Sequence, residues 1–192
     1  MAWKEQLKIF ESNGEWDIAI ELMLAVIQEH PDEVDAYIYI LFLLKNLLIE
    51  EDYNKNKRTY YVSILYKYFD KSYKKFLHNA EYLFCTGWTA SMCPWYFGIE
   101  REDADKMIHT ALILEPNNIF YQTAYYIELD RTITKNQIPS EAYARLILQD
   151  DSAITIAIKS RGALGECILG CMRGWAKEVL GLYPYDSSKA KN

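Results

Sequence analysis

Apolar and polar residues alternate along this chain with the period of an α-helix, most clearly between Glu102 and Asn118. The apolar positions on one face of that stretch are Ala104, Ile108, Ala111 and Leu112. Their spacing predicts a helix with one packed face. Pro116, followed by two asparagines, predicts the end of the helix. The small alanines at positions 104 and 111 predict that a neighbouring helix packs closely against this face.

The same period predicts helices along nearly the whole chain. The expected ranges are 2–12, 15–29, 33–49, 57–77, 79–96, 102 to just before Pro116, 119–131, 140–148, 152–159 and 163–180. Polar loops are expected at 50–56 and 132–139, and Pro94 is expected to kink or end its helix. Ser140 is expected to cap the helix after the second loop. No strand pattern of comparable length occurs, so the prediction is an all-α fold of about ten helices.

Two stretches of the chain share residues at matching offsets. The first carries Trp3, Phe10, Ala19, Met23 and Pro31, and the second carries Trp88, Trp95, Ala104, Ile108, Ala111 and Pro116. This set resembles the tetratricopeptide repeat, a helix-turn-helix unit of about 34 residues with a tryptophan, a second aromatic residue, small and large residues in its second helix, and a closing proline. The resemblance implies antiparallel helical hairpins stacked as a solenoid.

The expected array is degenerate. Departures from the family pattern are Leu7 and Met92 at the first-helix glycine, Val26 at the second alanine, and Pro94 within the second copy. Pro31 and Pro116 lie 85 residues apart, which is about two and a half standard repeats. Because the array must contain a whole number of helical hairpins, we expect two overlong helix pairs between these prolines. The prediction is one helical-repeat domain over residues 1–186 and a disordered tail over 187–192.

Charge is distributed unevenly over this chain of 192 residues, whose formal net charge is −6. Residues 53–75 hold seven Lys or Arg and one Asp, a local charge of +6, whereas the rest holds 14 cationic and 26 acidic residues, a charge of −12. Such a field favours a basic partner and disfavours broad contact with nucleic acid.

The N-terminal residues lack the apolar run and the small-residue cleavage site of a signal peptide, so we expect the chain to remain in the cytoplasm. The most apolar stretch, 36–49, has 14 residues interrupted by Lys45 and Asn46, which is short of the roughly 20 residues that span a bilayer. A buried helix is predicted there, without membrane contact. In the cytoplasm the four cysteines are expected to be reduced.

Residue types that often carry chemistry do not form a recognisable site. The histidines, which lie far apart and outside any metal-binding spacing, are His30, His78 and His109. Cys167 and Cys171 lie four residues apart, but no second pair follows, so core thiols are expected. Cys85 or Cys93 would be a nucleophile only beside a histidine and an orienting group. No catalytic residue, metal site or cofactor is predicted.

Four glycines crowd one segment near the C-terminus: Gly162, Gly165, Gly170 and Gly174. The segment lacks the Gly-Lys-Ser/Thr of a phosphate-binding loop, and Glu166 and Arg173 interrupt it in a way that disfavours membrane dimerisation. We expect close helix packing, because contact can offset the roughly 1 kcal/mol that glycine costs in a helix.

The basic segment at 53–75 also carries Tyr60, Tyr61, Tyr66, Tyr68 and Tyr73. Stacking rings and cations are the ingredients of single-stranded nucleic-acid binding. Three interpretations stay open: a solvated helix face, a docking site for an acidic partner or for the protein's own acidic surface, and nucleic-acid binding. A solvated face is favoured, because the apolar face of this helix leaves most lysines on the opposite side.

In tetratricopeptide arrays the first helix of each pair lines a concave groove, so the resemblance implies partner-binding residues. The candidates are Asp35, Tyr39, Phe42, Lys45 and Asn46 in the second pair, and Gln122, Thr123, Tyr126 and Arg131 in a later one. The alternative is that several of them, Phe42 in particular, belong to the core.

Together these features predict a protein that works by binding another protein and is not an enzyme. A cytoplasmic, acidic, all-α chain of this size resembles a bacterial toxin-immunity protein, which covers the active surface of a basic toxin; this is analogy in size, charge and fold. A general adaptor or chaperone fits the same features. The alternative from another class is an RNA- or nucleotide-handling protein that uses residues 53–75.

Overall fold

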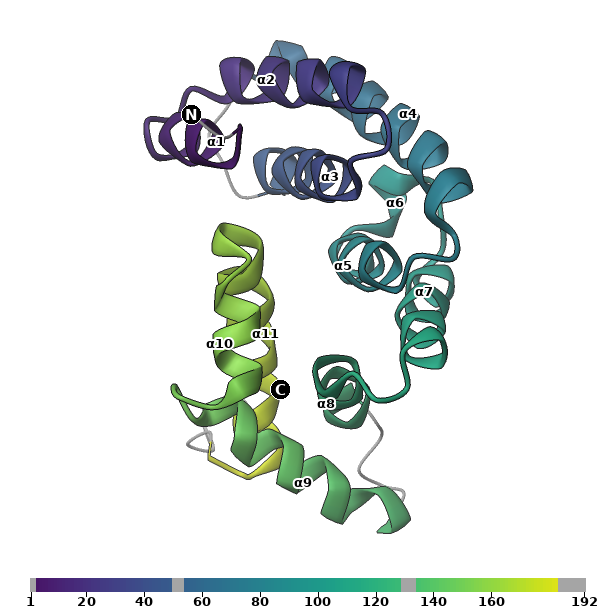
Figure 1. Cartoon of the computed structure of the whole chain (residues 1–192), viewed down its shortest axis with the longest axis vertical. Helices are drawn as coiled ribbons and strands as arrows, with labels where there is room; N and C mark the ends of the chain where they lie inside the picture. Colours follow the sequence, from purple (N-terminus) through teal and green to yellow (C-terminus); the bar gives the residue numbers. More distant parts are fainter. Residues whose placement is uncertain (1–2, 50–53, 129–133, 183–192) are drawn as a thin grey trace, which may run out of the picture. The chain divides into compact units, whose positions relative to one another are not determined.

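The computed structural model describes residues 3–49, 54–128 and 134–182. Over these ranges the chain forms eleven α-helices and one short 3₁₀ helix, with no strand, which confirms the predicted all-α class (Figure 1). None of the helices in these ranges combines the length and the apolarity needed to cross a membrane. By its contacts the chain divides into two compact units, Met1–Leu114 and Glu115–Asn192. The single domain expected over 1–186 stays a prediction.

The first unit is built from helical hairpins. Its elements are α1 (Trp3–Ser12), α2 (Trp16–Glu29), α3 (Val34–Ile49), the 3₁₀ helix Lys55–Lys57, α4 (Arg58–Phe76), α5 (Ala80–Ser91), α6 (Pro94–Phe97) and α7 (Arg101–Leu114). α1 packs on α2, α3 on α4, and α5 on α7; the short α6, which follows α5 along the chain, packs on α4 and α5 (Figure 1). Two helix pairs therefore lie between Pro31 and Pro116, as expected.

α3 and α5 form the centre of this unit. Eleven of the sixteen residues of α3 and eleven of the twelve residues of α5 are buried. α3 contacts α2, α4 and α5, so it meets neighbours on several sides. A helix that is apolar all round belongs inside a larger fold. The buried helix predicted at 36–49 is confirmed.

The helix predicted from Glu102 is α7, and it presents its alanine face to α5. Ala104 and Ala111 are fully buried there. A Cβ atom on Gly87 of α5 would lie 2.9 Å from the carbonyl oxygen of Ala104 and 2.9 Å from the Cβ atom of Met107. Glycine at this position therefore permits the close helix approach that the small residues predicted.

The two repeat-like stretches agree in their second helices and differ in their first. α2 and α7 bury residues at matching offsets, namely Ala19, Met23 and Val26 in one and Ala104, Ile108 and Ala111 in the other. Trp3, however, begins α1, whereas Trp88 lies near the C-terminal end of α5. Pro94 starts α6 after a break, so Trp95 lies on a separate helix. The match over the second copy's first helix is therefore wrong.

The second unit contains two further helix pairs. They are α8 (Ile119–Glu128) with α9 (Thr134–Leu148), and α10 (Ala153–Lys159) with α11 (Gly162–Val179). α9 also packs along α11, which joins the two pairs into one core. Ser152 caps α10 by accepting a hydrogen bond from the backbone N–H of Thr155.

The loop predicted at 132–139 is wrong where the structure describes it. α9 begins at Thr134 and contains Pro139. Ser140 does not cap a helix, because its hydroxyl donates a hydrogen bond to the carbonyl oxygen of Tyr126 on α8. Packing of α9 against α8 and α11 outweighs the roughly 3 kcal/mol that proline costs inside a helix. The predicted tail, 187–192, lies outside the described residues.

Gly165 and Gly170 of α11 differ in their surroundings. A Cβ atom on Gly165 would lie 1.9 Å from the carbonyl oxygen of Ile158, so close packing explains this glycine. Nothing lies within 4 Å of the corresponding position on Gly170. The close-packing expectation is therefore confirmed at Gly165 and wrong at Gly170, whose missing side chain would point into open space.

An ionic bridge at Asp150 links the end of α9 to α10 and α11. Its Oδ1 atom lies 2.9 Å from Nζ of Lys159 and 2.7 Å from Nη2 of Arg173. Hydrogen bonds from Arg173 and Lys159 lower the pKa of Asp150 to about 2. The carboxylate therefore stays ionised across the neutral and mildly acidic range.

We expect the Asp150 carboxyl to titrate near pH 2 in the folded protein. Because its pKa is lower in the folded than in the unfolded chain, the bridge stabilises the fold above about pH 4 and loses this effect as the pH falls toward 2. An NMR titration of the side-chain carboxyl carbon measures the midpoint. Arg173→Gln should return the midpoint toward the ordinary value, and a wild-type midpoint near 4 would contradict the bridge.

Candidate partner-binding surface

Two of the predicted groove residues, Asp35 and Tyr39 of α3, meet α1 at a polar and aromatic surface. The Trp3 ring lies edge-on to the Tyr39 ring at 5.6 Å between centroids. Nζ of Lys4 lies 5.3 Å from the Trp3 centroid and forms an ion pair with Asp35. Sequence reasoning missed Trp3 and Lys4 as parts of this surface, although the repeat resemblance had singled out Trp3.

The next three candidates on α3 point into the protein. Phe42 is buried, and Lys45 is only 1% exposed, with Nζ 5.4 Å from the centroid of the Phe42 ring. Asn46 is half-buried, and its side-chain oxygen is buried without a hydrogen bond. These residues pack the interior because α3 has neighbours on several sides. The binding role proposed for them from the groove resemblance is therefore not supported by exposure.

The candidates on α8 contact α9 within the second unit. The Tyr126 ring stacks on that of Tyr143, with centroids 5.0 Å apart and planes 5° apart. The Tyr143 hydroxyl donates a 2.9 Å hydrogen bond to Oε1 of Gln122, and Thr123 is fully buried. The structure thus brings Gln122 and Tyr126 together through Tyr143 of α9, whereas Thr123 is a core residue. Arg131 lies outside the described residues.

Cations of the basic segment contact side chains of their own unit. Lys57 pairs with Asp17, Lys75 with Asp32 and Lys74 with Asp70, while Arg58 lies over the Tyr96 ring and Lys67 and Lys71 over the Tyr68 ring. The pairs of Lys57 and Lys75 tie both ends of α4 to the two ends of α2. Part of the basic segment thus docks on the protein's own acidic surface. RNA phosphates would have to compete with these carboxylates.

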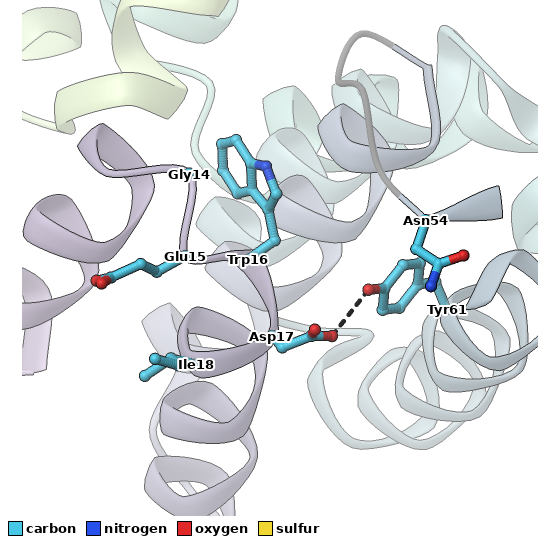
Figure 2. Close-up of a pocket in the computed structure, with 7 residues that line it drawn as sticks. All are labelled: Gly14, Glu15, Trp16, Asp17, Ile18, Asn54 and Tyr61. Atoms are coloured by element: carbon cyan, nitrogen blue, oxygen red, sulfur yellow. Dashed lines mark hydrogen bonds between the residues drawn. The ribbon is translucent and has the colours of Figure 1, made fainter. Parts of the chain in front are cut away.

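A hollow of about 330 Å³ opens where α2 begins, beside the start of α4. Its lining residues are Gly14, Glu15, Trp16, Asp17, Ile18, Asn54 and Tyr61. Figure 2 shows Asp17 pointing toward Tyr61, whose hydroxyl donates a 2.8 Å hydrogen bond to the carboxylate, while Glu15 and Ile18 point to the other side of α2. Hydrogen bonds from Lys57 and Tyr61 lower the pKa of Asp17, so its carboxylate stays ionised and is paired with the Lys57 cation at this edge of the hollow.

The described thiols do not lie in a reactive setting. Cys85 and Cys93 are buried, and burial raises the pKa of Cys93 to about 12. Cys167 and Cys171 of α11 were expected to be core thiols, but both are partly exposed. Over the described part of the chain, no three His, Cys, Asp or Glu side chains gather closely enough to hold a metal ion.

We expect the four thiols to alkylate in two classes. Cys167 and Cys171 should react with N-ethylmaleimide in the native protein, whereas Cys85 and Cys93 should react only after unfolding, because a buried thiol neither ionises nor meets the reagent. Mass spectrometry of peptides after timed alkylation distinguishes the classes. Rapid native labelling of Cys93 would contradict its burial.

Sequence reasoning matched Trp95 to the second aromatic position of the repeat and missed it as a surface residue. Its side chain is 66% exposed on α6. The signal that could have found it is Pro94, which begins a new helix and turns the next residue away from the face that α5 packs.

No family model, curated protein or solved structure matches the chain, so the class of protein is defined here by its fold and its surfaces alone. That class is an all-α protein of paired helices.

Proposed function

We propose that this chain is a protein-binding helical module that takes a basic partner on its first hairpin, and that it is not an enzyme. The observation that carries the proposal is the charge of α1, α2 and the turn after them. Residues 3–33 hold eight acidic residues and two lysines, a net charge of −6. The exposed acids among them are Glu5, Glu15, Asp17, Glu21, Glu29 and Asp32, of which Asp17 and Asp32 pair with Lys57 and Lys75. A hairpin of this net charge speeds encounter with a basic protein and disfavours acidic ones.

The surface between α1 and α3 supplies features beyond charge. Trp3 and Tyr39 hold each other edge-on, and Lys4 lies beside both rings while it pairs with Asp35. Aromatic side chains that are fixed before binding lose little entropy on association and often carry much of the affinity. The resemblance to tetratricopeptide arrays supports the same use of this surface.

Within this class we propose a toxin-immunity role in the cytoplasm as the narrower function. It rests on the acidic first hairpin and on the fold, by analogy. A general adaptor or chaperone would use the same surface. A growth assay distinguishes the two roles. Only an immunity protein restores the growth of cells that are arrested by expression of its captured partner.

The experiment is affinity capture from the native cell with three versions of the chain. We expect the wild type to retain a basic protein, and Glu21→Lys with Glu29→Lys to lose it, because both acids are exposed on α2. Glu166→Lys on α11 is the matched control, since it makes the same change at an exposed position of the second unit. The retained protein is then purified and titrated against each version by calorimetry.

The proposal fails if the double variant binds the purified partner as tightly as the wild type does. It also fails if the partner is acidic. Affinity that falls as salt rises is expected, because exposed charges are screened.

A further inference from the structure

A second surface of the first unit gathers exposed aromatic side chains. We define the α4–α6 patch as Arg58, Tyr66, Trp95 and Tyr96. Trp95 is 66% exposed and Tyr66 is 55% exposed. Tryptophan, tyrosine and arginine are the residue types enriched among those that dominate protein-protein affinity. Exposed aromatic side chains gathered in this way mark an interaction site more often than isolated ones do.

Contacts between α4 and α6 hold the patch together. Nη2 of Arg58 donates a 2.9 Å hydrogen bond to the Tyr96 hydroxyl, and the guanidinium lies over the Tyr96 ring at 5.8 Å. The Trp95 and Tyr96 rings are neighbours, with centroids 5.8 Å apart. Deeper in the same contact, Phe69 of α4 packs edge-on against Phe97 of α6 at 5.2 Å. A buried aromatic pair therefore anchors the helix that presents Trp95.

Gly98 fixes the position of Tyr66. It ends α6 with φ of +69°, a conformation that favours glycine. A Cβ atom at this position would lie 2.7 Å from Cε2 of Tyr66, so the ring lies directly on the glycine backbone. The Tyr66 ring is therefore exposed to solvent and is also packed against the Gly98 backbone. A ring held in this way loses little freedom when a partner covers it.

The charge around the patch determines which partner fits. α4, residues 58–76, carries five exposed cations and one acid, a net charge of +4. The exposed cations are Arg58, Lys67, Lys71, Lys74 and Lys75, of which Lys74 and Lys75 pair with Asp70 and Asp32. A basic partner would be repelled here, whereas carboxylates would be attracted. This surface is therefore opposite in charge to the acidic first hairpin.

We propose that the α4–α6 patch docks an acidic segment of a second protein partner. An apolar or aromatic side chain of that segment covers Trp95 and Tyr66, its carboxylates meet Arg58, and the net positive charge of α4 attracts them from a distance. The chain then carries two docking surfaces of opposite charge, one on its first hairpin and one on α4 and α6. This use of the patch does not depend on the function proposed for the first hairpin.

The test uses a defined probe and the full chain. A fluorescein-labelled peptide of glutamates around one central phenylalanine is titrated with the protein and followed by fluorescence anisotropy. Two further peptides replace the glutamates by serine or by lysine. We expect the glutamate peptide to bind best, and its Kd to rise about tenfold in Trp95→Ala and in Arg58→Glu. Higher salt should weaken binding of the glutamate peptide most.

Two matched variants serve as controls. Ile113→Ala removes a side chain that is 68% exposed on α7, and Lys8→Glu reverses an exposed cation on α1. Each should change the Kd by less than about twofold, within the range of ordinary surface substitutions. Circular dichroism of every variant confirms that the helices are retained.

Four results would overturn the proposal. The first is absence of binding of the glutamate peptide to the wild type, and the second is equal binding of the serine peptide. A uridine oligonucleotide that binds more tightly than the peptide, and through Trp95, would assign the patch to nucleic acid. A dimer in sedimentation velocity that Trp95→Ala dissociates would assign it to a second copy of the chain.

Discussion

Replacing Trp88 by alanine is expected to lower the free energy of unfolding of the first unit by about 3–5 kcal/mol. The Trp88 side chain is 2% exposed in α5, beside the Phe84 ring at 5.7 Å between centroids. Removing so large a buried side chain leaves a cavity that helices packed on several sides cannot fill by collapse. Urea unfolding followed by far-UV circular dichroism measures the loss, because this signal is dominated by the helical backbone and does not require tryptophan fluorescence.

Trp95→Ala is the matched control, seven residues further along the chain. The Trp95 side chain is largely exposed, so its loss is expected to change the free energy of unfolding by less than about 0.5 kcal/mol. Equal destabilisation by the two substitutions would contradict the separation of α5 from α6. The same control establishes that Trp95→Ala is a folded protein for binding measurements.

Gly165→Ala is expected to destabilise the second unit by about 3 kcal/mol, the upper part of the range for overpacked cores. The added Cβ atom would lie 1.9 Å from the carbonyl oxygen of Ile158, which is backbone and cannot turn away. α11 would have to move from the end of α10. Hydrogen exchange should therefore show lost amide protection in α10 and α11.

Gly170→Ala makes the same chemical change five residues later in the same helix, with the opposite expected sign. Beyond its own stretch of helix backbone, no described atom lies within 4 Å of the added Cβ, and alanine favours the helix over glycine by about 0.5–1 kcal/mol. The variant should resist urea better than the wild type. Destabilisation by Gly170→Ala would mean that this face of α11 is covered in solution.

Helix positions could be predicted from this sequence because apolar residues keep one period over long stretches. On α7, burial of Ala104, Ile108 and Ala111 and the close approach of a neighbouring helix were predicted, whereas buried Met107 was missed and Leu112 is only half-buried. Pro139 was misread because local propensity favours a break there, while the packing of α9 against α8 and α11 is a tertiary effect. The repeat match at Trp95 failed for the same kind of reason, because residues with the same spacing in two stretches of sequence need not lie on corresponding helices.

The candidate surface was harder to predict than the helices. Periodicity predicts which residues share a helix face, but it does not predict how many faces are covered. Because α3 is covered on several sides, Phe42 and Lys45 are buried, although they were predicted as groove residues together with Asp35 and Tyr39. The partners of Asp35 and Tyr39 come from α1, and those of Arg58 from α6. Such pairs form only when separate helices meet, and spacing along one helix does not contain that information.

The division of the chain into two compact units bears on cooperativity. A chain whose contacts fall into two units is expected to melt in two calorimetric transitions, so a single Tm would not describe it. Trp88→Ala should lower one midpoint and Gly165→Ala the other. A partner that binds the first unit should raise only the midpoint that Trp88→Ala lowers. Differential scanning calorimetry could then assign a newly found partner to its unit without a structure of the complex.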